Sequence, residues 1–158
     1  MGFHVSWIAA RGWTAEELVA ETRWELSGEQ ERCLNVGVFA ASPPGWALLV
    51  GDGVRYQPLV AYADALALSE RTEVVFFATD DTTMISVLTF LRGGETVWTA
   101  LADCSEGPAP VALTGAPPAR ALQLAAETED SYEVPALLGE ALVGFRHDRH
   151  HPVTLLHR

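Results

Sequence analysis

The sequence predicts an α+β protein: a single globular domain with a mainly antiparallel sheet of about five to seven strands and three or four helices on one face. The chain has 158 residues, of which 49% are hydrophobic, enough for a core of one-domain size. Three strand-like segments follow one another between residues 73 and 102 without a helix, which disfavours a doubly wound parallel sheet. The pair Gly93-Gly94 between the last two is typical of a tight hairpin, because both residues can adopt positive φ.

The first helix has the clearest signal. Partly alternating apolar residues over 3–10 predict a half-buried strand before it. Thr14, followed three residues later by Glu17, forms a capping box, and an apolar stripe continues to Leu26 before Ser27-Gly28. These features predict a helix over 14–26.

Three further helices are expected. The Ala- and Leu-rich run 59–68 suits one, Pro117-Pro118 opens another that reaches about residue 128, and a last helix begins near Pro135 and carries Phe145. Residues 1–145 therefore form the predicted single domain, followed by a basic, His-rich C-terminal tail over 146–158. The remaining strands are expected over 34–40, 46–50, 73–78, 84–91, 96–102 and 111–113.

The charge of the chain restricts its partners. There are 21 acidic residues, 10 arginines and no lysine, which gives a formal net charge of -11. Such a surface repels nucleic acid phosphates and acidic lipid headgroups and attracts cationic proteins. We therefore expect a cationic protein partner, no nucleic acid and no membrane.

Several classes of site are disfavoured by what the sequence lacks. No apolar run approaches the ~20 residues of a membrane-spanning helix, and the N-terminus lacks the basic start of a secretory signal, so a cytoplasmic location is expected. Cys33 and Cys104 are too isolated for a disulfide framework or a zinc motif and are interpreted as buried or idle thiols. No cofactor motif or catalytic signature is present, so no cofactor is expected and a non-enzymatic role is favoured.

The C-terminal segment holds the densest group of reactive side chains. In a helix, His147 and His151 would lie four residues apart on one face, a spacing used by zinc ligands, with Asp148 and His150 nearby. These four residues are the candidate metal ligands. The alternative is a solvated tail or a contact with the acidic surface, which we favour because the segment lacks most of a metal motif.

A second acidic candidate is the run Asp-Asp-Thr-Thr over 80–83. Paired carboxylates can hold a divalent cation or act in acid and base catalysis. Asp and Thr are also the residues expected of a turn, because their side chains accept hydrogen bonds from nearby backbone N–H groups. The turn is the favoured interpretation.

The predicted first helix also supplies a candidate partner surface. Glu17, Glu21 and Glu25 follow at four-residue intervals, where like charges are mildly unfavourable. A basic partner would account for such a ridge, and Trp24 beside it would be an aromatic anchor. A merely solvated helix face is the alternative.

Three segments carry a resemblance to known proteins. The start Ser6-Trp7-Ile8-Ala9 with Arg11-Gly12, the hairpin Gly93-Gly94-Glu95-Thr96-Val97-Trp98, and the end Leu142-Val143-Gly144-Phe145-Arg146-His147-Asp148 resemble a group of small uncharacterised bacterial proteins. The resemblance implies a bacterial origin and a shared fold and carries over no catalytic residue. In type, a small acidic bacterial protein of this kind is also similar to the immunity proteins that neutralise toxins.

The leading functional hypothesis is an acidic cytoplasmic protein-binding module, an immunity or inhibitor-like protein that neutralises a cationic partner. One alternative is an enzyme or a small-ligand or metal-binding protein that uses the C-terminal His cluster. Another is a homo-oligomeric structural subunit with an apolar interface.

Overall fold

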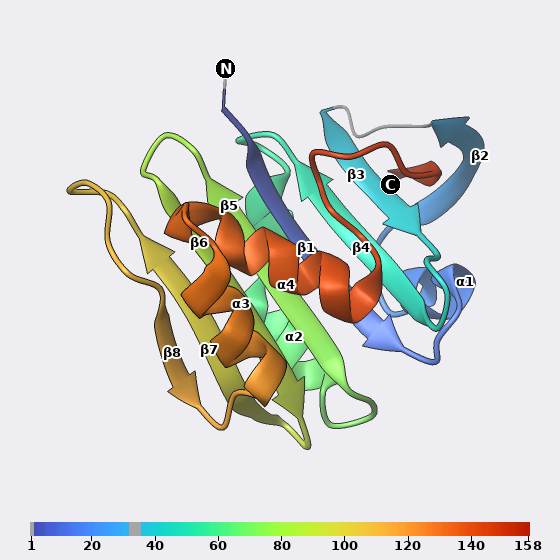
Figure 1. Ribbon diagram of the computed structural model, residues 1–158. Coiled ribbons are helices and arrows are strands. Elements are labelled where there is room, and N and C mark those ends of the chain that lie inside the picture. The colour runs from blue at the N-terminus through green and yellow to red at the C-terminus, as the bar shows by residue number, and fades with distance from the viewer. Residues whose placement is uncertain (1, 32–35) are drawn as a thin grey trace.

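The computed structural model describes residues 2–31 and 36–158, which form one twisted sheet with helices on both sides (Figure 1). Every strand pairing is antiparallel, and the strand order is β2-β9-β3-β4-β1-β5-β6-β7-β8. The strands are β1 His4–Arg11, β2 Glu25–Glu31, β3 Gly37–Ala41, β4 Trp46–Asp52, β5 Val74–Asp80, β6 Ile85–Arg92, β7 Glu95–Asp103, β8 Ala112–Gly115 and β9 Val153–His157. The helices are α1 Ala15–Ala20, α2 Tyr62–Leu68, α3 Ala119–Glu127 and α4 Val134–Val143, with short 3-10 helices η1 Gln57–Leu59 and η2 Ser131–Glu133.

The architecture corrects the predicted fold in two respects. The α+β class fits, but the predicted five to seven strands are too few, since the described residues form nine. The helices also cover both faces, with α3 and α4 on one side of the sheet and α1 and α2 on the other. The near-continuous burial of β1 is the physical reason, because Trp7 packs on the α4 side and Ile8 on the α1 side. A strand buried on both faces needs a cover on each.

The first helix is much shorter than the predicted 14–26. The capping box of Thr14 and Glu17 forms as expected, but α1 ends at Ala20 and Glu25 already begins β2. Thr22 ends the helix: its hydroxyl donates to the Val19 carbonyl at 2.6 Å and accepts from the Trp24 N–H at 3.0 Å. A threonine that bonds locally in this way competes with the helical hydrogen bonds.

The C-terminal segment 146–158, predicted as a tail outside the domain, contributes β9 to the sheet. This strand pairs with β2 on one side and with β3 on the other. Its buried residues Val153 and Leu156 face opposite cores. Strand β9 pairs with two strands from the first third of the chain, so its formation depends on long-range contacts. The five residues of β9 alone therefore did not predict a strand.

Other local predictions are confirmed. Arg92 pairs with Glu95 around Gly93 and Gly94, which have φ values of 63° and 77°. Helix α4 starts at Val134, close to the predicted start, but it ends at Gly144 with φ 82°, the left-handed geometry typical of a helix C-terminus, so Phe145, predicted to lie on this helix, lies just beyond it. The strand predicted over 34–40 is seen from residue 37, and residues 34 and 35 lie outside the described part of the chain, as does Cys33.

A close helix approach sets the α4 side of the core. Trp7 is 1% exposed, stacks on Phe77 with ring centroids 5.4 Å apart, and meets Phe145 edge-on. A Cβ on Gly139 of α4 would lie 2.8 Å from the Trp7 ring. Glycine at this position therefore lets α4 lie directly on the largest side chain of the sheet.

None of the helices in residues 2–31 and 36–158 is both long enough and apolar enough to cross a membrane.

Candidate functional site

The four residues predicted to contact a partner do not form one helical ridge. Glu17 is held in the capping box, where its carboxylate accepts from the Thr14 N–H and hydroxyl at 3.3 and 3.1 Å. Glu21, at the end of α1, forms a salt bridge with Arg71 at 2.9 Å. Glu25 is in β2, and its carboxylate lies 3.5 Å from the His157 Nε2 atom. The Trp24 ring lies under the Arg158 guanidinium. The ridge required one continuous helix, which the chain does not form.

The candidate metal ligands at the C-terminus make other contacts. His151 accepts a hydrogen bond from the Arg146 N–H at 3.2 Å, Asp148 pairs with the Arg146 side chain, and His150 is exposed. The segment is a turn rather than a helix, so the helical spacing on which the pairing of His147 and His151 was predicted does not apply. Within the described ranges, no three His, Cys, Asp or Glu side chains are grouped in a way that could hold a metal ion.

His147 instead belongs to the packed interior. Its ring stacks on Phe77 at 5.3 Å and meets the Phe3 ring edge-on at 4.8 Å. Its Nδ1 atom is buried and has no hydrogen-bond partner among the described residues. Burial lowers the pKa of His147, against the opposing effect of the neighbouring carboxylates of Asp148 and Asp81.

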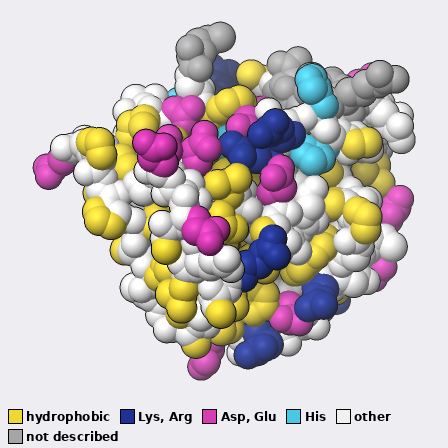
Figure 2. Space-filling model, in the orientation of Figure 1, with side chains coloured by type: hydrophobic (Ala, Val, Ile, Leu, Met, Phe, Trp, Pro, Cys, Tyr) yellow, Lys and Arg dark blue, Asp and Glu magenta, His cyan; other side chains and the backbone are white. Residues whose placement is uncertain are grey.

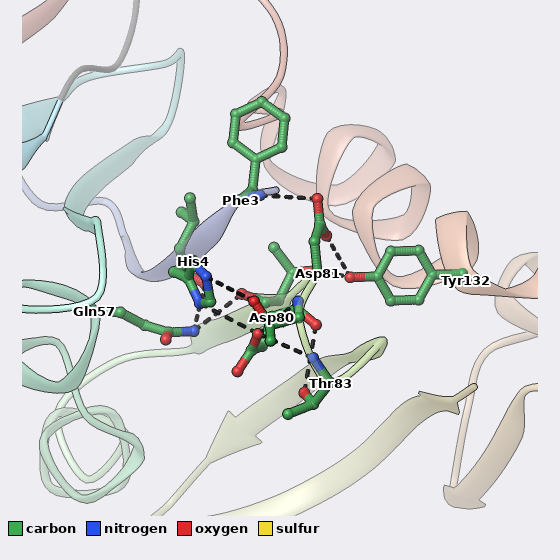
Figure 3. A network of polar contacts seen from close by, with 10 residues as sticks. Phe3, His4, Gln57, Asp80, Asp81, Thr83 and Tyr132 are labelled. Atoms are coloured by element: carbon green, nitrogen blue, oxygen red, sulfur yellow. Dashed lines mark hydrogen bonds and ion pairs between the residues drawn. The ribbon is translucent and has the colours of Figure 1, made fainter. Parts of the chain in front are cut away.

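A polar network joins the start of the chain to the turn after β5 (Figure 3). The register of β1 and β5 pairs His4 with Asp80, and the His4 Nδ1 atom lies 3.2 Å from the Asp80 carboxylate. Asp80 also accepts from the backbone N–H groups of Thr82 and Thr83 at 2.9 and 3.3 Å, as expected for a turn. The favoured turn interpretation of residues 80–83 is therefore confirmed.

Asp81 points to the other side of this turn, toward the start of α4. It accepts from the Phe3 N–H at 2.8 Å and from the Tyr132 hydroxyl at 2.5 Å (Figure 3). The same Tyr132 hydroxyl lies 2.9 Å from the hydroxyl of Thr79. Burial, together with the hydrogen bond to Asp81, raises the pKa of Tyr132, so its hydroxyl stays protonated and donates. The network thus ties three distant segments together and holds η2 against the sheet.

A cleft opens beside η2, with a volume of about 530 Å³. Its size falls within the range of side-chain and small-ligand pockets. Met84, 39% exposed, lines it from a backbone with φ 59°, and it is the one non-glycine residue with positive φ in the described part of the chain. Such strained positions often accompany binding surfaces. The lining consists of Met84, Cys104, Gly107, Pro108, Glu129, Asp130, Ser131 and Tyr132.

The rim of this cleft is acidic. Glu129 and Asp130 line it directly, Asp103 ends β7 beside it, and Glu106 lies on the loop that follows. None of the described lining residues is basic. The Ser105 hydroxyl donates to Asp103 at 2.6 Å and lowers the pKa of that carboxyl. Acidic side chains gather at the upper left of Figure 2, over the ends of β5 and β6 and the start of α4 in Figure 1. We call this feature, defined by the lining residues with Asp103 and Glu106, the acidic cleft.

The acidic cleft was not found from the sequence, because its residues come from three separate segments. The run Thr-Glu-Asp over 128–130 and the polar loop after residue 103 were each recognisable as acidic and exposed. Their proximity depends on Ser131, whose hydroxyl donates to the Ala109 carbonyl and lies 3.8 Å from the Cys104 sulfur. A contact between residues this far apart in the chain leaves no periodic pattern in the sequence from which it could be predicted.

Comparison with known proteins finds no matching family model, no matching curated protein and no matching solved structure.

Proposed function

We propose that this protein is a cytoplasmic binding module for a cationic protein, of the immunity or inhibitor-like type, and that the partner contacts the acidic cleft. The observation that carries the proposal is the combination of carboxylates with an apolar floor in one concave site. A net charge of -11 accelerates the approach of a basic partner and disfavours nucleic acids.

The chemistry of the cleft suits a long basic side chain. Met84 and Tyr132 offer apolar surface along which the methylene groups of Arg or Lys can pack. Glu129 and Asp130 lie where the charged end would be neutralised. Buried anchors surrounded by complementary charge are the usual source of affinity at protein interfaces.

The intramolecular contacts of the first helix favour this site over the one predicted from sequence. Glu17 already accepts hydrogen bonds in the capping box of α1, and Glu21 already forms a salt bridge with Arg71. A partner would have to break these contacts to bind the two carboxylates. Glu106 and Glu129 are exposed and form no ion pair with any described residue. They can neutralise a partner without breaking existing contacts.

The test is co-purification of the protein with its partner from its bacterial host at about 50 mM and about 500 mM salt. The cleft variant Glu106→Gln/Glu129→Gln is compared with Glu16→Gln/Glu29→Gln, which removes the same charge from exposed positions elsewhere. We expect one basic protein on the wild type and the control, lost from the cleft variant and released by salt. Equal retention by the cleft variant would exclude this site, and absence of any basic partner would exclude the proposed function.

A second measurement separates the two surfaces. With the purified partner, charge reversal at Glu129 is compared with charge reversal at Glu25, which is 76% exposed at its side chain. We expect the dissociation constant to rise about tenfold or more for Glu129→Lys and to change less than about threefold for Glu25→Lys. A larger rise in the dissociation constant for Glu25→Lys than for Glu129→Lys would show that the partner binds near α1 and β2 instead of the acidic cleft.

A further inference from the structure

A cavity of about 730 Å³ lies on the other side of the sheet, between α1, the start of β2 and α2. It shares no lining residue with the acidic cleft. Its floor is apolar and comes from two strands and two helices. The floor residues are Ile8, Leu18, Leu49 and Leu68. Its volume is typical of a small-molecule site.

Cationic groups surround this apolar floor. Arg23, Arg71 and Arg158 all line the cavity, although the chain has only 10 basic residues apart from histidine. Two carboxylates, Glu21 and Asp64, also line it. Cationic side chains therefore outnumber carboxylate side chains in the lining, and one of the two carboxylates, Glu21, is already paired with Arg71.

Aromatic contacts orient two of these guanidinium groups. Arg158 lies over the Trp24 ring at 5.1 Å, and Arg71 lies over the Trp13 ring at 4.7 Å. Stacking on an aromatic face leaves the edge of the guanidinium, with its N–H donors, available to a planar anion. Arg71 is also fixed by its salt bridge with Glu21. Neither Arg23 nor Arg158 forms an ion pair with a described residue.

We propose that this cavity binds a small organic carboxylate with an apolar or aromatic body. Arg pairs with carboxylates through two parallel hydrogen bonds, and Arg23 and Arg158 form no ion pair with a described residue that a ligand would have to displace. The apolar body would pack on Leu59, which is 39% exposed, and lie against Trp24. This site is independent of the proposed partner surface, because no residue belongs to both.

The test uses 1-naphthylacetate as the probe, with the neutral 1-naphthylacetamide as the matched control, in an NMR titration that follows the Trp24 indole N–H. We expect naphthylacetate to bind with a dissociation constant of about 1 mM or tighter and the amide to bind at least tenfold more weakly. Equal affinity of the two compounds, or no shift of the Trp24 resonance up to about 10 mM probe, would overturn the proposal.

Two pairs of variants locate the binding. Arg23→Gln and Arg158→Gln should each weaken binding about tenfold, whereas Arg92→Gln, exposed at the β6–β7 turn, should leave it unchanged. Ala67→Phe should fill the cavity, while Ala63→Phe, exposed one turn earlier on α2 and outside the lining, should not. All these positions are exposed, so circular dichroism and thermal unfolding should match the wild type. Binding that survives both arginine changes or Ala67→Phe would overturn the assignment.

Discussion

The buried guanidinium of Arg146 donates two hydrogen bonds to the carboxylate of Asp148, at 2.6 and 3.1 Å. Arg146 is 7% exposed, and a Glu133 oxygen lies 3.8 Å from its Nη2 atom. Burial opposes ionisation of Asp148, but the hydrogen bonds with Arg146 and the charges of His147 and Arg146 outweigh it and lower the pKa of Asp148. The pair anchors the turn between α4 and β9.

Removal of one partner should therefore be costly. Asp148→Ala leaves the Arg146 charge buried with only the more distant Glu133, and we expect a loss of about 2 to 3 kcal/mol in the free energy of unfolding. Urea unfolding at pH 7 measures it. Glu140→Ala, at an exposed position on α4, is the control and should change stability by less than about 0.5 kcal/mol. A loss no larger than the control would show that the pair contributes nothing.

The hydroxyl of Tyr132 makes a second separable contribution. Tyr132→Phe removes the hydroxyl that donates to Asp81. It also removes the hydrogen-bond partner of the Thr79 hydroxyl, and Thr79 is only 3% exposed. We expect a destabilisation of about 1 to 2 kcal/mol. Tyr62→Phe removes an exposed hydroxyl that bonds to Thr96 and should cost less than about 1 kcal/mol. The thermal denaturation midpoints of the two variants provide the comparison, and equal midpoints would contradict it.

His147 should make stability depend on pH. Because burial lowers its pKa below the ordinary value of 6.5, the unfolded chain binds more protons between the two values. This contribution to stability is fully present above pH 6.5 and is lost as the pH falls from 6.5 toward the folded pKa.

The measurement is urea unfolding at a series of pH values from about 7.5 to 5. His147→Phe should flatten the loss of stability below pH 6.5, because the replacement cannot be protonated and still packs on Phe77. His150→Gln, on an exposed histidine three residues away, should retain the wild-type profile. An unchanged slope in His147→Phe would assign the pH dependence to other groups.

Gly139 should resist even the smallest substitution. Alanine is the better helix former by about 1 kcal/mol, yet its Cβ would lie 2.8 Å from the Trp7 ring. We expect Gly139→Ala to destabilise the protein by about 1 to 3 kcal/mol because α4 or the Trp7 ring must shift. Ala141→Leu, which adds volume at an exposed position of the same helix, should be nearly neutral. Stabilisation by Gly139→Ala would mean that the α4 interface yields readily.

Local signals in the chain were sufficient for the features that depend on a few neighbouring residues. The Thr14 capping box, the Gly93-Gly94 hairpin and the turn at 80–83 all form as expected. Each is set by backbone geometry and short-range hydrogen bonds, which the residue types at those positions specify directly. The excess of acidic residues is likewise a property of composition.

Features that need distant segments could not be read in this way. Strand β2 is polar throughout, with only Leu26 as an apolar residue, and it exists because β9 pairs with it. That pairing, the second helical layer, the acidic cleft and the arginine-rich cavity all bring together residues that are far apart in the chain. Their formation depends on the packing free energy of the whole fold, which cannot be inferred from a short stretch of neighbouring residues.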